Sequence, residues 1–224
     1  MFRHVGLNPD RLRNLAALAE TIGALTRRRL ARLRYQPERD VRNALTPPAD
    51  KPVLVIAGES GAGKTWQLGR FLQSCSDARQ IATLVTAVRT PADLMAQSAM
   101  DLWQMGLGET SEKSLVAVSK FLRELEPDNI GPRMIVVVDD IQNVDLARDL
   151  VRLDWADWQM QLVLTVPHSV ARALQLTDEE LVHVHSVGEF SVDELDELLK
   201  RSGRRWADLP PDLKRILRNP ILAG

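Results

Sequence analysis

The sequence is almost without cysteine and has no long apolar run, and both absences limit the class of protein. Cys75 is the single cysteine among 224 residues, so no intramolecular disulfide can form and no cysteine cluster can bind zinc. This usage is typical of a reducing cytosol, and we expect a cytoplasmic location. The longest aliphatic runs, Val53–Ala57 and Met134–Val138, fall far short of the roughly 18 residues of a membrane-spanning helix. Residues 1–15 lack the apolar stretch of a signal peptide. We therefore expect no membrane partner.

The sequence also lacks a net charge of either sign. Its 29 basic and 30 acidic residues give a formal charge of −1, and the hydrophobic fraction of 45% is close to the average of soluble globular proteins. Such a chain is not a polyelectrolyte that binds nucleic acid over its whole surface. The distribution is uneven, because residues 1–50 carry ten arginines against five acids.

Residues 1–50 are predicted to form a helical arm and a linker. Asn8 and Pro9 are a helix-start signal, and leucine and isoleucine residues at spacings of three and four predict a helix over about 9–34. Arginines crowd the end of this helix, at positions 27, 28, 29, 32 and 34. We interpret them as a solvated helix end that interacts with the helix dipole, with phosphate or nucleic-acid contact as the alternative.

From Pro52 onward, short apolar runs alternate with longer helical patterns. The runs span 53–57, 81–88, 134–138, 161–166 and 181–187. Runs rich in Val and Ile with helices between them indicate parallel strands that are buried on both faces. We predict an α/β fold with a mostly parallel five-stranded sheet flanked by helices over 51–188. A capping box at Ser191–Glu194 opens a helical lid over 189–224.

A glycine-rich motif lies between the first predicted strand and the helix that follows it. The residues are Gly58, Glu59, Ser60, Gly61, Ala62, Gly63, Lys64 and Thr65, which match GxxxxGK[ST], and Trp66 continues the helix. The glycines let main-chain amides converge on a polyphosphate. Lys64 can place its ammonium on the β and γ oxygens, and the Thr65 hydroxyl can coordinate Mg²⁺. We predict that these residues bind a nucleoside triphosphate with Mg²⁺.

Two acidic residues that complement this loop follow the third run, 134–138, and the first of them lies 75 positions after Lys64. Asp139 is the predicted metal-side carboxylate, and Asp140 is the candidate base that polarises the attacking water. The spacing leaves room for an intervening strand and two or three helices, as when the two motif strands are not joined directly as neighbours. The alternative is a pair of acids that end a strand in solvent. His168, after the fourth run, is a candidate contact for the γ-phosphate or an ordinary exposed loop histidine.

Together these motifs resemble the P-loop ATPases of the additional-strand class, in particular the STAND signalling NTPases with their NACHT and plant-resistance relatives. The resemblance covers about residues 35–224. It implies that the nucleotide is ATP or ADP, that the segment ending at Arg39 helps to enclose the base, and that Pro220 packs on the adenine. It further implies slow hydrolysis, a role as a switch in defence or regulatory signalling, and a homo-oligomer on activation. The family's proteins are larger, so we expect a fragment or a minimal relative.

Two other function classes remain open. The segment Val138–Gln142 also resembles the acidic motif of replication initiators, which implies a DNA-handling AAA+ ATPase in which the basic arm contacts phosphates. A nucleotide-dependent scaffold without catalysis is the third hypothesis.

Overall fold

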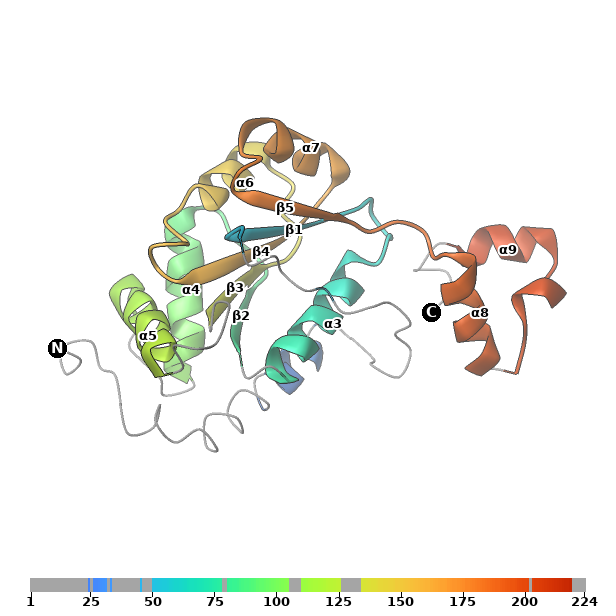
Figure 1. Cartoon of the computed structure of the whole chain (residues 1–224), viewed down its shortest axis with the longest axis horizontal. Helices are drawn as coiled ribbons and strands as arrows, with labels where there is room; N and C mark the ends of the chain where they lie inside the picture. Colours follow the sequence, from blue (N-terminus) through green and yellow to red (C-terminus); the bar gives the residue numbers. More distant parts are fainter. Residues whose placement is uncertain are drawn as a thin grey trace.

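The protein is built around one parallel sheet with helices on both faces (Figure 1). The computed structural model describes residues 50–77, 80–104, 110–125, 134–201 and 203–218, together with 24, 26–31, 33 and 45. The strands are β1 (Val53–Ala57), β2 (Ile81–Val85), β3 (Met134–Val138), β4 (Met160–Val166) and β5 (Val182–Ser186). The helical elements labelled in sequence order from the glycine-rich loop are α3 (Lys64–Asp77), α4 (Pro91–Gln104), α5 (Glu112–Leu125), α6 (Val144–Val151), α7 (His168–Thr177), α8 (Val192–Arg201), the 3-10 turn η3 (Trp206–Asp208) and α9 (Pro211–Leu217).

The order of the strands confirms the predicted fold class. They follow one another as β2-β3-β4-β1-β5, and every pairing is parallel. Strand β4 therefore lies between β1, which leads into the glycine-rich loop, and β3, which leads into Asp139. The two motif strands are thus not neighbours in the sheet, as the spacing between Lys64 and Asp139 indicated. Because all five strands are parallel, their carboxyl ends meet at one edge of the sheet.

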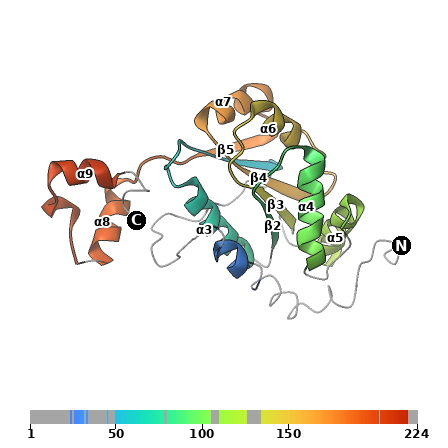
Figure 2. The same ribbon diagram turned by 180° about the vertical axis from the view of Figure 1, so that it is seen from behind.

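Each face of the sheet is covered by a separate hydrophobic layer. Alternate strand residues pack against α4, α5, α6 and α7 on one face, and the other alternate set packs against α3 and Leu30. Figure 2 shows α4 and α5 on the side opposite α3. The strands β1 to β4 are buried throughout, which explains their continuous apolar sequences.

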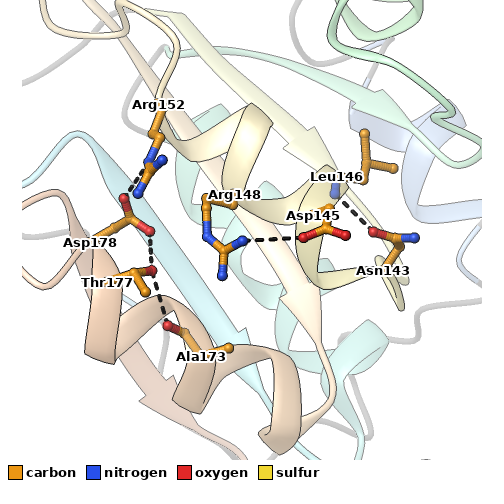
Figure 3. A network of polar contacts seen from close by, with 8 residues as sticks. All are labelled: Asn143, Asp145, Leu146, Arg148, Arg152, Ala173, Thr177 and Asp178. Carbon is orange, nitrogen blue, oxygen red and sulfur yellow. Dashed lines mark hydrogen bonds and ion pairs between the residues drawn. The ribbon is translucent and has the colours of Figure 1, made fainter.

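Helix α6 was not predicted, although its local signals are present. The Asn143 side chain caps it by accepting from the Leu146 N–H at 2.9 Å. Its end is tied to the end of α7, because Arg152 Nε lies 2.7 Å from the Oδ1 atom of the buried Asp178 (Figure 3). Thr177 donates a hydrogen bond to the same carboxylate. Burial raises the pKa of Asp178, but these two partners outweigh it and hold the pKa below its ordinary value.

One arginine of the basic cluster is not at a solvated helix end, so that interpretation was wrong for Arg29. Its side chain is 4% exposed, and its NH2 nitrogen lies 3.0 Å from Asp101 Oδ2 on α4. The same carboxylate oxygen accepts from the Leu84 N–H of the edge strand β2 at 3.4 Å. Arg27 and Arg28 are exposed, as predicted. The described part of the arm therefore packs against the sheet and its helices.

The lid helices follow β5 and lie beside the sheet rather than on one of its faces (Figure 1). The predicted capping box is present, since Ser191 N–H donates to Glu194 Oε2 at 2.7 Å and Glu194 N–H donates to Ser191 Oγ at 3.2 Å. The Phe190 N–H donates to the Arg218 carbonyl at 2.9 Å, which joins the start of α8 to the end of α9. None of the helices in the described part of the chain is long and apolar enough to cross a bilayer.

Candidate nucleotide-binding site

The glycine-rich loop leaves the carboxyl end of β1 and turns directly into α3. Gly61 and Gly63 have φ angles of 85° and 87°, a left-handed conformation that glycine adopts without steric cost. The Ala62 N–H donates to the Glu59 carbonyl at 3.1 Å, which closes the turn. Helix α3 begins at Lys64, and the first amides of a helix have no acceptor within it. The loop therefore has the backbone of an anion-binding turn at a helix N-terminus.

Gly58 is required for a different reason, which is close packing. A Cβ atom at this position would lie 2.6 Å from the Val187 carbonyl oxygen, just after β5. Val187 also donates its N–H to the Ala57 carbonyl at 2.6 Å, and the Gly58 N–H donates to the Val166 carbonyl at 3.1 Å. The loop is thus anchored to the ends of both strands that flank β1.

Lys64 points its ammonium back into the loop. Its Nζ atom donates to the Gly58 carbonyl at 2.7 Å and to the Glu59 carbonyl at 3.0 Å. These two oxygens hold the positive charge beside the loop amides, at the start of α3. An anion in the loop would therefore meet the amides and the ammonium together.

Thr65 and Asp139 lie side by side although 74 positions separate them. Thr65 Oγ1 is 3.4 Å from Asp139 Oδ2, at the tips of α3 and β3. Both side chains are oxygen donors, the ligand type that Mg²⁺ prefers. The structure therefore brings together the two residues that the sequence assigned to the metal.

Asp140 follows with an unusual backbone. Its φ angle is 61°, in the left-handed region that non-glycine residues seldom adopt. The turn exposes the Asp140 side chain, which accepts from the Gln142 amide, while Ile141 is buried in the core. Asp139 and Asp140 thus differ in surroundings, since only Asp139 is half-buried beside the loop.

Sequence reasoning missed Thr165, which is fully buried on β4 between the two motif strands. Its hydroxyl donates to Asp139 Oδ1 and accepts from the Asp140 N–H at 2.7 Å. Nothing in the sequence marks this threonine, because Thr is common in strands. Only the position of β4 beside β3 brings it to the twin acids.

The remaining predicted residues lie around this centre or outside the described part of the chain. Glu59 and Ser60 are exposed in the loop. The half-buried side chain of Trp66 packs against the hydrophobic layer between α3 and the sheet. His168 is exposed as the first residue of α7. Arg39 and Pro220, the predicted contacts of the base, lie outside the described residues.

The donor set fits a nucleotide polyphosphate with a divalent cation. Amides and an ammonium face an anion from the loop, whereas a hydroxyl and a carboxylate offer oxygen ligands beside it. The positive and negative groups are held by different elements, α3 and β3, at one edge of the sheet.

Comparison with protein families matches residues 49–174 to the AAA domain, which is more than half of the chain. Among solved structures, a chain of the E. coli MS115-1 HORMA:CdnC:Trip13 complex is similar at 15% identity and a TM-score of 0.39, over 96% of this chain and 72% of that one. A chain of the Drosophila ORC complex with GC-rich DNA and Cdc6 is similar at 12% identity and a TM-score of 0.37, over 93% and 71%. The family match spans the loop, both acids and the five elements between them, and the chain therefore belongs to the AAA domain family.

Proposed function

We propose that this protein binds ATP and ADP with Mg²⁺ at the loop 58–65 and hydrolyses ATP slowly. The observation that carries the proposal is the approach of Thr65 Oγ1 to Asp139 Oδ2 at 3.4 Å, next to a lysine held inside the same loop. A glycine-rich turn without this partner would be an ordinary turn. The AAA domain match over residues 49–174 supports the same activity.

Each residue of the site has a role that follows from its chemistry. The loop amides and the Lys64 ammonium bind the phosphate oxygens, and Lys64 exchanges its present carbonyl acceptors for them. Thr65 and Asp139 would hold the cation, which supplies charge neutralisation on the transferred phosphoryl group. Asp140, exposed beside Asp139, is the residue that we assign to accepting a proton from the attacking water. His168, exposed at the start of α7, is the proposed contact for the γ-phosphate.

The biological role that we propose is a nucleotide-dependent switch that controls oligomerisation in signalling or defence. The lid is connected to the site through Val187, whose carbonyl packs on Gly58 and whose N–H binds Ala57. A ligand shifts such an equilibrium only through its different affinity for the two conformations. We expect that difference to arise at the proposed γ-phosphate contacts of Lys64, Thr65 and His168. The resemblance to STAND NTPases supports the role as a signalling or defence switch and the choice of adenine as the base.

Identification of the nucleotide that accompanies the purified chain tests the proposal directly. Retained ADP would support a switch in its resting state, whereas a guanine nucleotide would contradict the base assignment. Hydrolysis is tested by comparing the wild type with Asp140→Asn. If both release phosphate at the same background rate, the chain is a nucleotide-dependent scaffold and not an enzyme.

A DNA-handling ATPase is the second candidate, and exposed Arg27 and Arg28 are the observation in its favour. Arg29 does not contribute to it, because its charge is paired with Asp101. ATP turnover that rises on addition of duplex DNA, with binding that weakens steeply as salt increases, would favour this candidate. A rate of ATP turnover that does not change on addition of DNA would favour the nucleotide-dependent switch instead.

A further inference from the structure

Thr165 hydrogen-bonds to both acids of the site with a single hydroxyl group. The side chain has no exposed surface, and it lies on β4 between the strand of the glycine-rich loop and the strand of the acids. Its Oγ1 atom is bonded to Asp139 Oδ1 and, at 2.7 Å, to the backbone nitrogen of Asp140. The Asp140 amide can only donate. The hydroxyl proton therefore points to the Asp139 carboxylate.

This proton fixes the orientation of the Asp139 carboxylate. The Oδ1 atom accepts from Thr165, and the Oδ2 atom is thereby turned toward Thr65 Oγ1 at 3.4 Å. Hydrogen bonds to an ionised acceptor are among the stronger ones in proteins, and this one lies on a strand that is buried throughout. Without the hydroxyl, the carboxylate has one fewer partner to set its rotamer.

The same residue also holds the turn that follows. Besides accepting from the Asp140 N–H, Thr165 accepts through its carbonyl from the Ile141 N–H at 2.9 Å. The left-handed conformation of Asp140, with a φ of 61°, is thus held on both sides of the residue. Thr165 on the neighbouring strand β4 therefore helps to place both acids.

We propose that Thr165 is a positioning residue that orients the Asp139 carboxylate to bind Mg²⁺. The Thr165 hydroxyl is then needed only for the part of nucleotide binding that depends on the metal. The inference rests on the proposed function. The loop amides and Lys64 make their contacts independently of Thr165, so nucleotide binding without metal does not require the hydroxyl.

The test compares affinity for a fluorescent ADP analogue in EDTA and over a series of Mg²⁺ concentrations. In Thr165→Val, which keeps the shape and loses the hydroxyl, affinity in EDTA stays within about twofold of the wild type. The Mg²⁺ concentration for half-maximal enhancement rises about 10- to 100-fold, the usual effect of losing a partner of a metal ligand. Thr165→Ser, which restores the hydroxyl, requires close to the wild-type Mg²⁺ concentration.

Thr83→Val is the matched control. Thr83 is also fully buried on a strand, and its hydroxyl donates to Ser98 Oγ at 3.2 Å, away from both acids. Its loss should leave both affinities unchanged. If Thr165→Val does not fold, Thr165→Cys carries the same test, because a thiol is a weak donor of similar size.

An unchanged Mg²⁺ requirement in Thr165→Val, or an equal loss of affinity in EDTA and in Mg²⁺, would overturn the inference while leaving the proposed function intact. A wild-type chain that binds no nucleotide would contradict the proposed function, and this inference with it.

Discussion

The carbonyl oxygen of Val187 lies 2.6 Å from the place that a Cβ atom on Gly58 would occupy. The first residue of the glycine-rich loop and the last buried residue before the lid therefore pack against each other without room for a methyl group. The obstacle is backbone, which cannot move aside as a flexible side chain can.

Gly58→Ala should destabilise the protein by about 1–3 kcal/mol and weaken nucleotide binding, because the loop or the end of β5 must shift. Chemical denaturation and a nucleotide titration measure the two effects. Gly188→Ala is the control, since no described residue beyond its two chain neighbours has an atom within 4 Å of its Cβ position. Equal stability of the two variants would mean that the close packing does not limit residue 58.

Asp101→Asn should lower the free energy of unfolding by about 3 kcal/mol, since it removes a charged partner of a buried guanidinium. The Arg29 side chain is 4% exposed and that of Asp101 is 16% exposed. The comparison is Asp145→Asn, which removes the ion pair between Asp145 and Arg148. The Asp145 side chain is 88% exposed, so this substitution should lower the free energy of unfolding by less than about 0.5 kcal/mol. Similar losses in both variants would contradict the structural role of Arg29.

Asp178 should make stability depend on pH in the acid range. Because its pKa is lower in the folded state than in the unfolded chain, its contribution is fully present above the ordinary value of about 4 and is lost as the pH falls toward the folded pKa. The gap in unfolding free energy between the wild type and Asp178→Asn should therefore narrow between neutral pH and about pH 3. Parallel stability curves would show that the ion pair with Arg152 does not hold this carboxylate.

Cys75 should not react with thiol reagents in the folded protein. The residue is 2% exposed in the hydrophobic layer that contains α3. Burial raises the pKa of its thiol, and the nearby charge of Arg29 lowers that pKa by less than burial raises it. Labelling with Ellman's reagent should proceed only at the rate of unfolding and accelerate with denaturant. Complete labelling within seconds in native buffer would place Cys75 at the surface instead.

Much of the sheet could be predicted because its strands are buried on both faces. Val53–Ala57 and Met134–Val138 were predicted with the bounds that they have, and the spacing between Lys64 and Asp139 left room for β2 and the helices that come between them in sequence. A buried parallel strand must be apolar along its whole length, and that pattern is visible in sequence.

The features that were missed depend on partners far away in the chain. Thr165 acquires its role only because β4 pairs with β3, and Arg29 is buried by a carboxylate 72 positions later. Neither relationship has a local signal. Helix α6 does have a local signal, in the capping residue Asn143 and the apolar spacing after it. Its eight residues make only about two turns, so the helical periodicity is weak.

Calorimetric titration of Mg²⁺ and ATP into the wild type, Lys64→Ala and Lys51→Ala tests whether Lys64 and the surrounding loop bind a nucleotide. Lys51 is the matched control, since its ammonium also donates to two carbonyls, of Glu179 at 2.7 Å and Val182 at 3.0 Å, but lies at the opposite end of β1. We predict saturable binding to the wild type and to Lys51→Ala, and no detectable binding to Lys64→Ala. The same dissociation constant for all three proteins would show that Lys64 does not bind the nucleotide.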